Sequence, residues 1–390
     1  MLRNIIDLLE DLGDYGKVIR DRQKRQRPGE GIDYTSRKYR EAVRRAVERL
    51  HPKQMRLRVA EIIRDTPSTK TFRLTREDGD LPPFRAGQYV NLFVTIDKVL
   101  TSRPYSISSP PGREYIDLTV RNRPGGFVAP YLLRKIKKGD VLNSTGPTGS
   151  FYYEPLIDGH DLVFLAGGSG ITPFMSILRR QAEMDWPQRI TLLYGSRRIQ
   201  DVIFDKELAR LAQASERFNY ARIISEPPKN FRGLKGFIDA KTIRKFAGEA
   251  EDKTFYICGP NAMFDFCLPE LAKFGALPHK IKRELYGPPD DVTREPGWPK
   301  KVKPETMFRV RVNGRDIKAR AGEPLLNSLE RQGVVAPAVC RSGECSACRT
   351  KLIEGRVYMP PHTGVREADR QYGYIHACVS YPLSDLVIAI

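Results

Sequence analysis

Four cysteines constrain this chain more than any other feature of its sequence. Cys340, Cys345 and Cys348 have the spacing C-x4-C-x2-C, and Cys378 follows thirty residues after the third of them. This is the spacing of the ligands of a plant-type [2Fe-2S] cluster. Gly343 lies between the first two cysteines and can take backbone angles that other residues avoid, which lets the loop curl around a small core. The pattern therefore predicts a cluster-binding domain and an electron-transfer protein.

Two other uses of these cysteines are a zinc site and disulfide bonds. Structural zinc usually takes two short Cys/His pairs, and only Cys345 and Cys348 form such a pair here. Disulfides need an oxidising compartment, and the sequence shows no route to one. Both uses are therefore less favoured than the iron-sulfur cluster.

Length and hydropathy set the outer limits of the fold. A chain of 390 residues predicts two to four domains. No apolar run reaches the roughly 18 residues needed to cross a bilayer. The first residues lack the uninterrupted apolar core of a signal peptide. We therefore expect a cytoplasmic protein without a membrane span.

The formal net charge of +19 suggests an anionic partner. An acidic protein, a nucleic acid or an anionic lipid would each fit such a charge. The basic residues are spread along the chain and are not gathered in one arm with interleaved aromatic residues, so a nucleic-acid partner is not expected. An acidic redox partner is the favoured interpretation, and solubility alone is the bland one.

The first half of the chain predicts an extension followed by a barrel. Residues 1–54 form a helical N-terminal extension with one amphipathic helix over 2–12 and an arginine-rich helix over 36–50. This extension is either a packing appendage or a docking arm. Residues 55–155 contain short strand patterns separated by Pro and Gly, which predict a small antiparallel β-barrel. The expected strands include 57–61, 71–74, 89–96 and 116–121.

The second half predicts an α/β domain and the cluster domain. Residues 156–287 alternate strand patterns with helical stretches, as in an α/β domain with a parallel sheet. Residues 288–304 are rich in Pro and predict a semi-rigid linker that separates the cluster domain, residues 305–390, from the rest. The expected strands of the α/β domain include 162–166, 190–194, 220–224 and 254–258.

The tetrapeptide Arg103-Pro104-Tyr105-Ser106 suits a flavin. Pro104 favours an extended backbone before it, and alternation along a strand places Arg103 and Tyr105 on one face. A guanidinium can pair with a phosphate, an aromatic ring can lie on the isoalloxazine, and Ser106 can reach its redox-active edge. An ordinary strand is the alternative.

Two turns of the predicted α/β domain suit a dinucleotide. Gly167, Gly168 and Gly170 follow a buried strand and precede a helix, so backbone amides can approach a pyrophosphate. The spacing is not G-x-G-x-x-G, and a plain tight turn fits equally well. Cys258-Gly259-Pro260 ends another strand, where open α/β sheets bind ligands. There Cys258 is a small, soft neighbour for a nicotinamide.

In this order the motifs resemble the ferredoxin-NADP reductase superfamily. Over residues 56–390 the layout is similar to phthalate dioxygenase reductase and its relatives, with a flavin barrel, a nicotinamide domain and a C-terminal α+β ferredoxin-like (β-grasp) domain. The segments that carry the resemblance are 84–89, 103–106, 146–151, 167–173, 258–260 and 284–286.

The resemblance implies roles for particular residues. Arg103, Tyr105 and Ser106 would hold the flavin, and Thr172 would approach both flavin and nicotinamide. Cys258 would lie near the hydride path, and Glu284 would match the acidic residue of the family near the nicotinamide. Ala129 stands where relatives often carry a serine for the FAD pyrophosphate, so the amides of Gly126, Phe127 and Val128 would serve instead.

The resemblance also implies the cofactors. FAD is favoured over FMN because residues 146–151 are similar to the FAD-binding branch. NADH is favoured slightly over NADPH, although Ser196-Arg197-Arg198 could clasp a 2′-phosphate. The four cysteines would hold the [2Fe-2S] cluster.

The implied function is an oxidoreductase that passes electrons from NAD(P)H through FAD and the cluster to an external metalloprotein. An oxygenase, a corrinoid protein or a hybrid-cluster protein would be such an acceptor. A fixed electron-transfer subunit of a larger redox complex is the alternative, and a redox-sensing module is a third. Residues 305–390 carry twelve Lys/Arg against nine Asp/Glu, whereas plant ferredoxins are acidic, so the acceptor should dock through a different surface.

Overall fold

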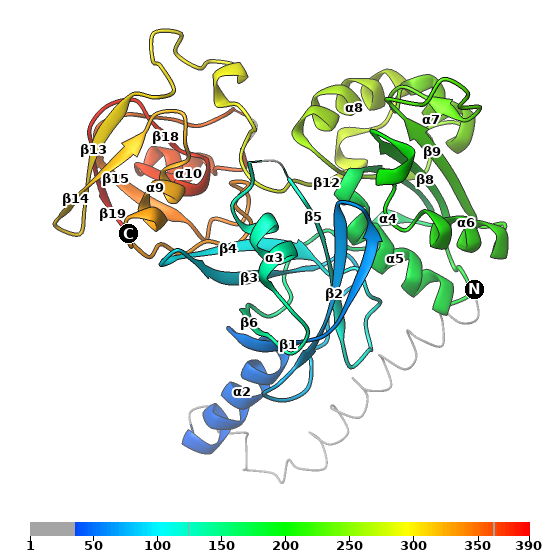
Figure 1. The fold of residues 1–390 in the computed structure, drawn as a ribbon, viewed down its shortest axis with the longest axis horizontal. Coiled ribbons are helices and arrows are strands. Elements are labelled where there is room, and N and C mark those ends of the chain that lie inside the picture. The colour runs from blue at the N-terminus through cyan, green and yellow to red at the C-terminus, as the bar shows by residue number, and fades with distance from the viewer. Residues whose placement is uncertain (1–35, 124, 362) are drawn as a thin grey trace, which may run out of the picture. The chain divides into compact units, whose positions relative to one another are not determined.

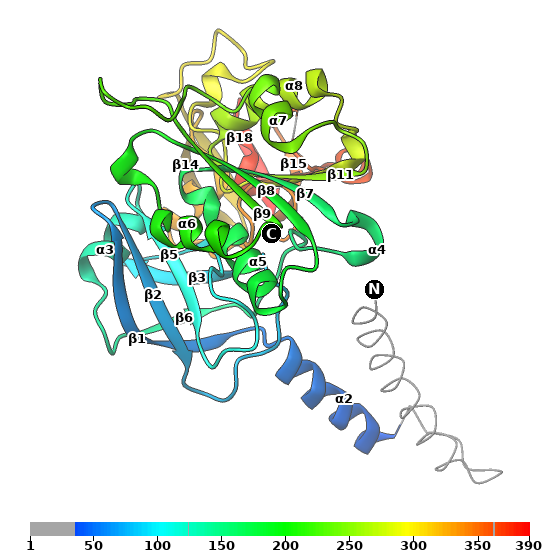
Figure 2. The same cartoon turned by 90° about the vertical axis from the view of Figure 1, so that its right-hand side faces the viewer.

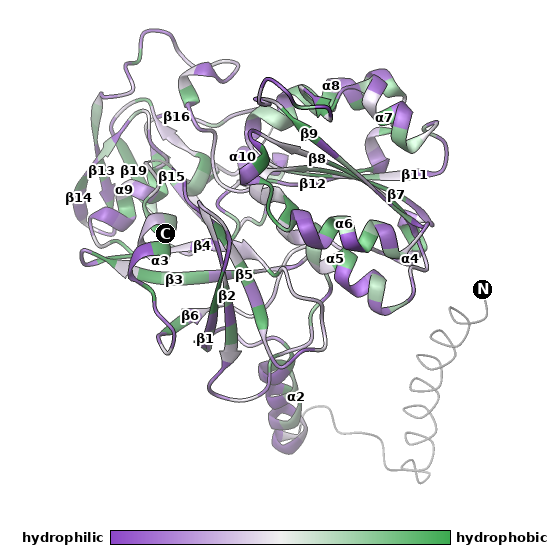
Figure 3. Cartoon of the chain, turned by 45° about the vertical axis from the view of Figure 1, so that its right-hand side comes forward, coloured by the Kyte–Doolittle hydropathy of each residue, from purple (hydrophilic) through white to green (hydrophobic). Residues whose placement is uncertain are grey.

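The computed structural model describes residues 36–123, 125–361 and 363–390, and the chain divides into two compact units, 1–52 and 53–390 (Figure 1). In the first unit, helix α2 (Arg37–Leu50) begins after Ser36, whose side chain accepts a hydrogen bond from the Tyr39 amide at 3.2 Å. The predicted second helix is thereby confirmed, and the predicted helix over 2–12 lies outside the described residues. None of the residues of α2 is buried, and the helix is largely hydrophilic (Figure 3).

The second unit begins with a six-stranded antiparallel sheet, in the order β4-β3-β6-β1-β2-β5. Directly after β4, Ile107 pairs with Leu118 of β5 in an antiparallel bridge, which closes the sheet into the predicted barrel. Helix α3 (Val128–Lys135) packs Val128 and Leu132 into the barrel core. The strands are β1 (Met55–Thr66), β2 (Thr69–Arg76), β3 (Tyr89–Ile96), β4 (Val99–Ser106), β5 (Ile116–Arg121) and β6 (Val141–Ser144).

A parallel sheet follows, in the order β10-β9-β8-β7-β11-β12 (Figure 2). Apolar residues of α5 and α6 pack on one face of the sheet, and those of α7 and α8 pack on the other. The first strand, β7, lies inside the sheet between β8 and β11, so the order of strands reverses there. Ligands of open α/β sheets bind at such a switch point. The predicted α/β domain is therefore confirmed.

Its strands are β7 (Asp161–Gly167), β8 (Arg189–Ser196), β9 (Phe218–Ile224), β10 (Leu234–Lys235), β11 (Lys253–Cys258) and β12 (Ile281–Glu284). Its helices are α4 (Pro155–Asp158), α5 (Ile171–Glu183), α6 (Asp205–Ala214), α7 (Ala240–Ala247) and α8 (Asn261–Phe274).

The C-terminal part forms a mixed five-stranded sheet, in the order β14-β13-β19-β15-β17, and a small sheet of β16 and β18. Leu325, Leu326 and Leu329 of helix α9 pack against it, as expected of a ferredoxin-like domain. The elements are β13 (Met307–Val312), β14 (Arg315–Arg320), α9 (Leu325–Arg331), β15 (Arg349–Glu354), β16 (Val357–Tyr358), α10 (Glu367–Gln371), β17 (Tyr374–His376), β18 (Tyr381–Pro382) and β19 (Leu386–Ala389).

The segment predicted as a linker, 288–304, packs onto the C-terminal part. Val292 and Trp298 are buried in one apolar cluster with Tyr358 and Tyr381. The Trp298 and Tyr358 rings meet edge to face with centroids 5.3 Å apart, and the Tyr358 hydroxyl donates to the Pro296 carbonyl at 2.7 Å. The proline content of this segment predicted a semi-rigid linker that separates the cluster domain from the rest of the chain. These aromatic contacts pack the segment onto the cluster domain.

No helix in the described ranges is long and apolar enough to cross a membrane.

Candidate functional site

The ends of β7 and β11 meet at the switch point and leave room only for glycine. A Cβ on Gly167 would lie 2.5 Å from the Met263 sulfur and 3.0 Å from the Pro260 ring. A Cβ on Gly170 would overlap the carbonyl of Cys258. The two predicted turns thus pack directly on each other, because their glycines allow close approach.

Beside these turns lies a cavity of about 570 Å³. The cavity is lined by Ser196, the last residue of β8, and by Arg197, which follows it. Gly167, Gly168 and Pro260 of the two turns line it as well. The structure therefore brings these predicted dinucleotide-binding residues together. Gly259 lies behind them, since a Cβ there would reach the Met263 sulfur and the backbone of Gly167.

Glu226 also lines this cavity, and no sequence pattern marked it as a site residue. The Arg197 Nε lies 2.6 Å from one carboxylate oxygen of Glu226, and the Arg198 Nε lies 3.5 Å from the other. The hydrogen bond from Arg197 lowers the pKa of Glu226. The two arginines predicted for a 2′-phosphate are therefore already paired with one carboxylate.

Phe237 and Phe266 also line this cavity, with ring centroids 5.4 Å apart. They are 65% and 39% exposed, which is unusual for phenylalanine. Exposed rings at the open edge of a cavity fit a planar base. No local pattern marked them, because they belong to different segments of the chain.

A second cavity, of about 130 Å³, lies where the barrel meets the parallel sheet. The barrel contributes Pro104, Tyr105 and Ser106, and the start of helix α5 contributes Thr172. The structure thus joins four predicted flavin-site residues from two domains. We call this space the flavin cavity.

Tyr286, Arg121 and Thr119 also line the flavin cavity and were not predicted as site residues. The Tyr286 hydroxyl is hydrogen-bonded to the hydroxyl of Ser106. Arg121 lines both cavities, so the two spaces are neighbours. A tyrosine 180 residues away from its serine partner leaves no signal in local sequence.

Arg103 is not among the described residues that line the flavin cavity. Its Nη1 donates to the Thr101 hydroxyl at 2.8 Å and to the Ser102 carbonyl at 2.7 Å. Burial and the nearby Arg341 guanidinium lower the pKa of Arg103 to about 10. Its proposed pairing with a flavin phosphate stays a prediction.

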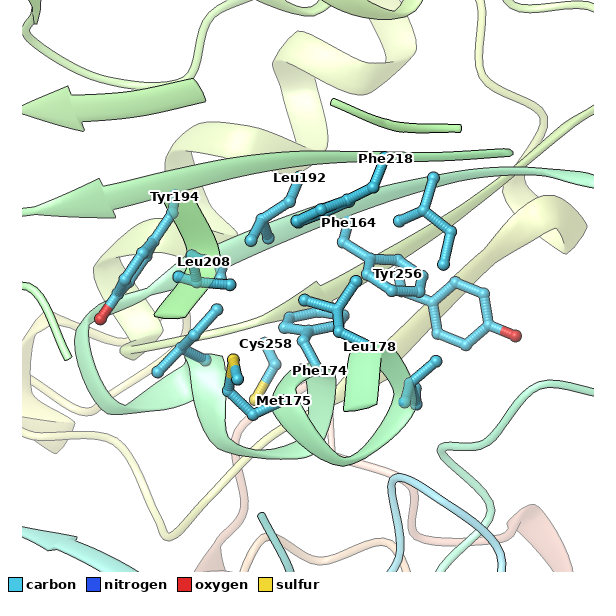
Figure 4. Packing of buried hydrophobic residues seen from close by; sticks show 14 of the residues in the cluster. Phe164, Phe174, Met175, Leu178, Leu192, Tyr194, Leu208, Phe218, Tyr256 and Cys258 are labelled. Carbon is cyan, nitrogen blue, oxygen red and sulfur yellow. The ribbon is translucent and has the colours of Figure 1, made fainter. Parts of the chain in front are cut away.

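Cys258 lies in the core of the α/β domain, next to Met175 and Phe174 (Figure 4). It is completely buried and is not among the described residues that line either cavity. Burial raises the pKa of its thiol. Its predicted contact with a nicotinamide stays a prediction, and the turn through Gly170 packs against its backbone carbonyl.

Glu284 is paired with Cys258 across β11 and β12, and only 7% of it is exposed. Its Oε2 has no hydrogen-bond partner among the described residues. Burial raises the pKa of this carboxyl, and Glu344 and Cys340 add to the effect. A buried carboxyl oxygen left unpaired fits a polar ligand group such as a carboxamide.

The predicted pyrophosphate amides lie at the start of α3. The Gly126 amide already donates to the Arg123 carbonyl at 2.9 Å. Phe127 and Val128 begin the helix, where the first amides lack partners inside the helix. The Gly126 amide is therefore already used in a hydrogen bond within the chain, and the predicted role of the Phe127 and Val128 amides stays a prediction.

The four cluster cysteines lie together in two pairs. The Cys348 and Cys378 sulfurs are 3.2 Å apart, and the Cys340 sulfur accepts hydrogen bonds from the amides of Cys345 and Ser342, each at 3.4 Å. The side chains of Cys345 and Cys378 both lower the pKa of the Cys340 thiol, so the two pairs are adjacent. Two adjacent pairs of thiolates with amide donors fit a [2Fe-2S] core.

Comparison with known families agrees with this arrangement. Residues 54–153 match an oxidoreductase FAD-binding domain, 164–268 match an oxidoreductase NAD-binding domain, and 309–383 match a 2Fe-2S iron-sulfur cluster binding domain. FAD, NAD and the [2Fe-2S] cluster are therefore the cofactors for which these domains are built.

Two curated relatives span nearly the same length. The NADH oxidoreductase HCR of Escherichia coli (strain K12) is 32% identical over 340 residues, which cover 86% of this chain and 97% of the relative. The glycine betaine monooxygenase reductase subunit of Pseudomonas aeruginosa (strain UCBPP-PA14) is 27% identical over 350 residues, which cover 85% of this chain and 94% of the relative.

Among solved structures, phthalate dioxygenase reductase shares the fold with a TM-score of 0.64 and 23% identity, covering 86% of this chain and 98% of that one. The alignments thus extend over almost the whole of each relative. The chain belongs to the ferredoxin-NADP reductase superfamily, in the group of oxidoreductases whose FAD- and NAD-binding domains are followed by a C-terminal 2Fe-2S domain.

Proposed function

We propose that this chain is the reductase component of an oxygenase-type system, in which electrons taken from NADH leave through the cluster to a separate metalloprotein. The proposal rests chiefly on the adjacency of the flavin cavity and the cluster loop. The ring of Tyr286, in the flavin cavity, meets the ring of Tyr89 edge to face at 6.5 Å. Burial raises the pKa of Tyr89, and the nearby Cys340 and Cys345 raise this pKa further.

The residues divide this work between binding and orientation. FAD, when bound, would supply the exchange between a hydride and single electrons, and a cluster held by the four cysteines would supply one-electron transfer. Tyr105 offers its ring to the flavin, while Ser106 and Thr172 orient polar groups at the junction of the two domains. Tyr286 covers the same junction and keeps water out of it.

The Tyr105 ring should be required for flavin retention. We expect Tyr105→Ala to lose most of its flavin on dialysis, since an aromatic face contributes about 0.5–1.5 kcal/mol beyond its buried area. The ratio of flavin absorbance to protein measures this loss. Tyr115→Ala is the control, because Tyr115 packs against Arg73 outside the cavity. Full flavin content in Tyr105→Ala would contradict the assignment.

Glu226 should favour NADH over NADPH. Its carboxylate neutralises Arg197 and Arg198 and would repel a 2′-phosphate. A unit charge at about 4 Å contributes roughly 1 kcal/mol in water, so Glu226→Gln should raise the NADPH/NADH ratio of kcat/KM about fivefold. Glu249→Gln is the control, because Glu249 also pairs with an arginine, Arg244, but lies outside the cavity. An unchanged ratio in Glu226→Gln would count against this role.

The acceptor that we propose is an acidic metalloprotein. The net charge of +19 supports this, and the names of relatives such as the glycine betaine monooxygenase reductase subunit support an oxygenase. The two cysteines outside the predicted cluster, Cys258 and Cys267, form no disulfide bond, as in a reducing compartment, which supports a cytoplasmic location. The second candidate is a fixed subunit of a larger redox complex, and co-purification with a partner at high salt would favour it.

An anaerobic absorbance titration tests the proposed function. The FAD- and cluster-loaded protein is titrated with NADH and, separately, with NADPH. We expect NADH to bleach the flavin and cluster bands together at low excess. If neither nucleotide reduces the protein, the isolated chain is not a competent reductase and the complex-subunit proposal takes its place.

A further inference from the structure

A buried guanidinium joins the cluster loop to the flavin barrel. Arg341 directly follows the cluster ligand Cys340, and its side chain is only 4% exposed. It forms an ion pair with Glu330 of α9, itself 10% exposed. Its Nη2 also donates to the hydroxyl of Thr101, on β4 of the barrel, at 3.2 Å. The residue beside a cluster ligand therefore contacts the strand that carries the flavin motif.

Thr101 is a point of contact between the flavin barrel and the cluster domain. Its hydroxyl donates to Glu330 at 2.9 Å and accepts from Arg103 at 2.8 Å, in addition to Arg341. A hydroxyl has one proton to donate and two lone pairs, so the bonding capacity of Thr101 is filled. It is only 3% exposed, so water does not replace these bonds.

A second contact holds the same loop. Asn91 of β3 donates to the carbonyl of Ala338 at 2.8 Å, two residues before Cys340. Its Nδ2 also donates to Ser102 at 2.9 Å, which fixes the orientation of the amide. The barrel thus contacts the loop on both sides of Cys340, at Ala338 and at Arg341.

This arrangement resists movement of the cluster domain. Glu330 and Arg341 both belong to the cluster domain, so their ion pair would move with it, and movement would instead break the buried hydrogen bonds of both residues to Thr101. Sliding of the loop would leave Glu330 and Arg341 without the Thr101 hydroxyl. The flavin cavity and Cys340 are therefore kept in one relative position.

We infer that Arg341 is a positioning residue: through Thr101 and Glu330 it holds the cluster loop against the flavin barrel and thereby sets the rate of electron transfer from flavin to cluster. This inference rests on the proposed electron path. Electron transfer slows steeply as donor and acceptor separate. The hydride step, which uses other residues, should not depend on Arg341.

Stopped-flow absorbance under anaerobic conditions separates the two steps. In Arg341→Gln, mixed with NADH, we expect flavin reduction at the wild-type rate and cluster reduction slowed about tenfold or more, since small displacements of reacting groups cost large factors in rate. Iron content and the cluster spectrum should be unchanged. Arg331→Gln is the matched control, because Arg331 lies on α9 beside Glu330 and pairs with Glu323 inside the cluster domain.

A second variant guards against loss of the cluster in Arg341→Gln. Thr101→Val changes only the barrel side of the contact and should slow the same phase, with flavin content measured alongside. Because both act through one contact, Thr101→Val/Arg341→Gln should be no slower than the slower single variant. If Thr101→Val, with flavin and cluster intact, reduces the cluster at the wild-type rate, the inference is overturned. If the wild-type cluster itself is not reduced after the flavin, the proposed function fails instead.

Discussion

A Cys345→Ser variant is expected to keep NADH-dependent bleaching of the flavin and to lose electron delivery to a one-electron protein acceptor. Cys345 and Cys340 form one of the two adjacent cysteine pairs, and its amide donates to the Cys340 sulfur. Removing one thiolate ligand should prevent assembly of the [2Fe-2S] cluster. The two cavities that we propose for FAD and nicotinamide are lined by residues between 104 and 286, outside the cluster domain, so the hydride step should continue.

Two assays on one preparation measure this separation. Stopped-flow absorbance follows flavin reduction, and reduction of cytochrome c follows delivery. Ser346→Ala is the control, because it alters the same loop without removing a thiolate. Delivery at the wild-type rate by Cys345→Ser would refute the assigned path, and loss of flavin bleaching would show that the cluster domain supports the hydride step.

A Gly170→Ala variant is expected to unfold at a much lower temperature than the wild-type protein. The added Cβ would lie 2.5 Å from the carbonyl carbon of Cys258 and 2.7 Å from the amide nitrogen of Gly259. These are backbone atoms, so no side-chain rotation relieves the overlap, and β7 and β11 would have to separate. Overpacking typically costs about 1–3 kcal/mol in free energy of unfolding, and sometimes more.

Thermal unfolding followed by circular dichroism measures the loss. Gly195→Ala on the neighbouring strand β8 is the control, since its Cβ would meet nothing closer than 3.7 Å. We expect this control to unfold near the wild-type temperature. Equal unfolding temperatures for the two variants would mean that the turns do not pack as tightly as described.

Much of the fold followed from local sequence. The predicted strands over 89–96 and 116–121 agree with β3 and β5, and the helix predicted over 36–50 agrees with α2. These elements could be predicted because side-chain alternation and capping act between residues close in sequence. The cofactors followed as well, since the cysteine spacing and the order of motifs are themselves features of the sequence.

How far the sequence could place a site residue depended on whether its neighbours are close in the chain or distant. Tyr105, Ser106 and Thr172 line one cavity, whereas Arg103 and Cys258 are not among the described residues that line it. Cys258 ends a strand beside the expected ligand, but its side chain points into the core of the sheet. Sequence placed the residue at the correct edge and could not tell which neighbours would cover it.

The sequence by itself determined the domain order, the cofactor set and the elements that carry each motif. Only the tertiary structure decided that Tyr286 joins Ser106, that Glu226 pairs with the arginines predicted for a 2′-phosphate, and that Arg341 reaches Thr101. The last of these contacts spans 240 residues. Such contacts depend on how separate domains pack, and packing is set by the shapes of whole surfaces, which no short sequence pattern encodes.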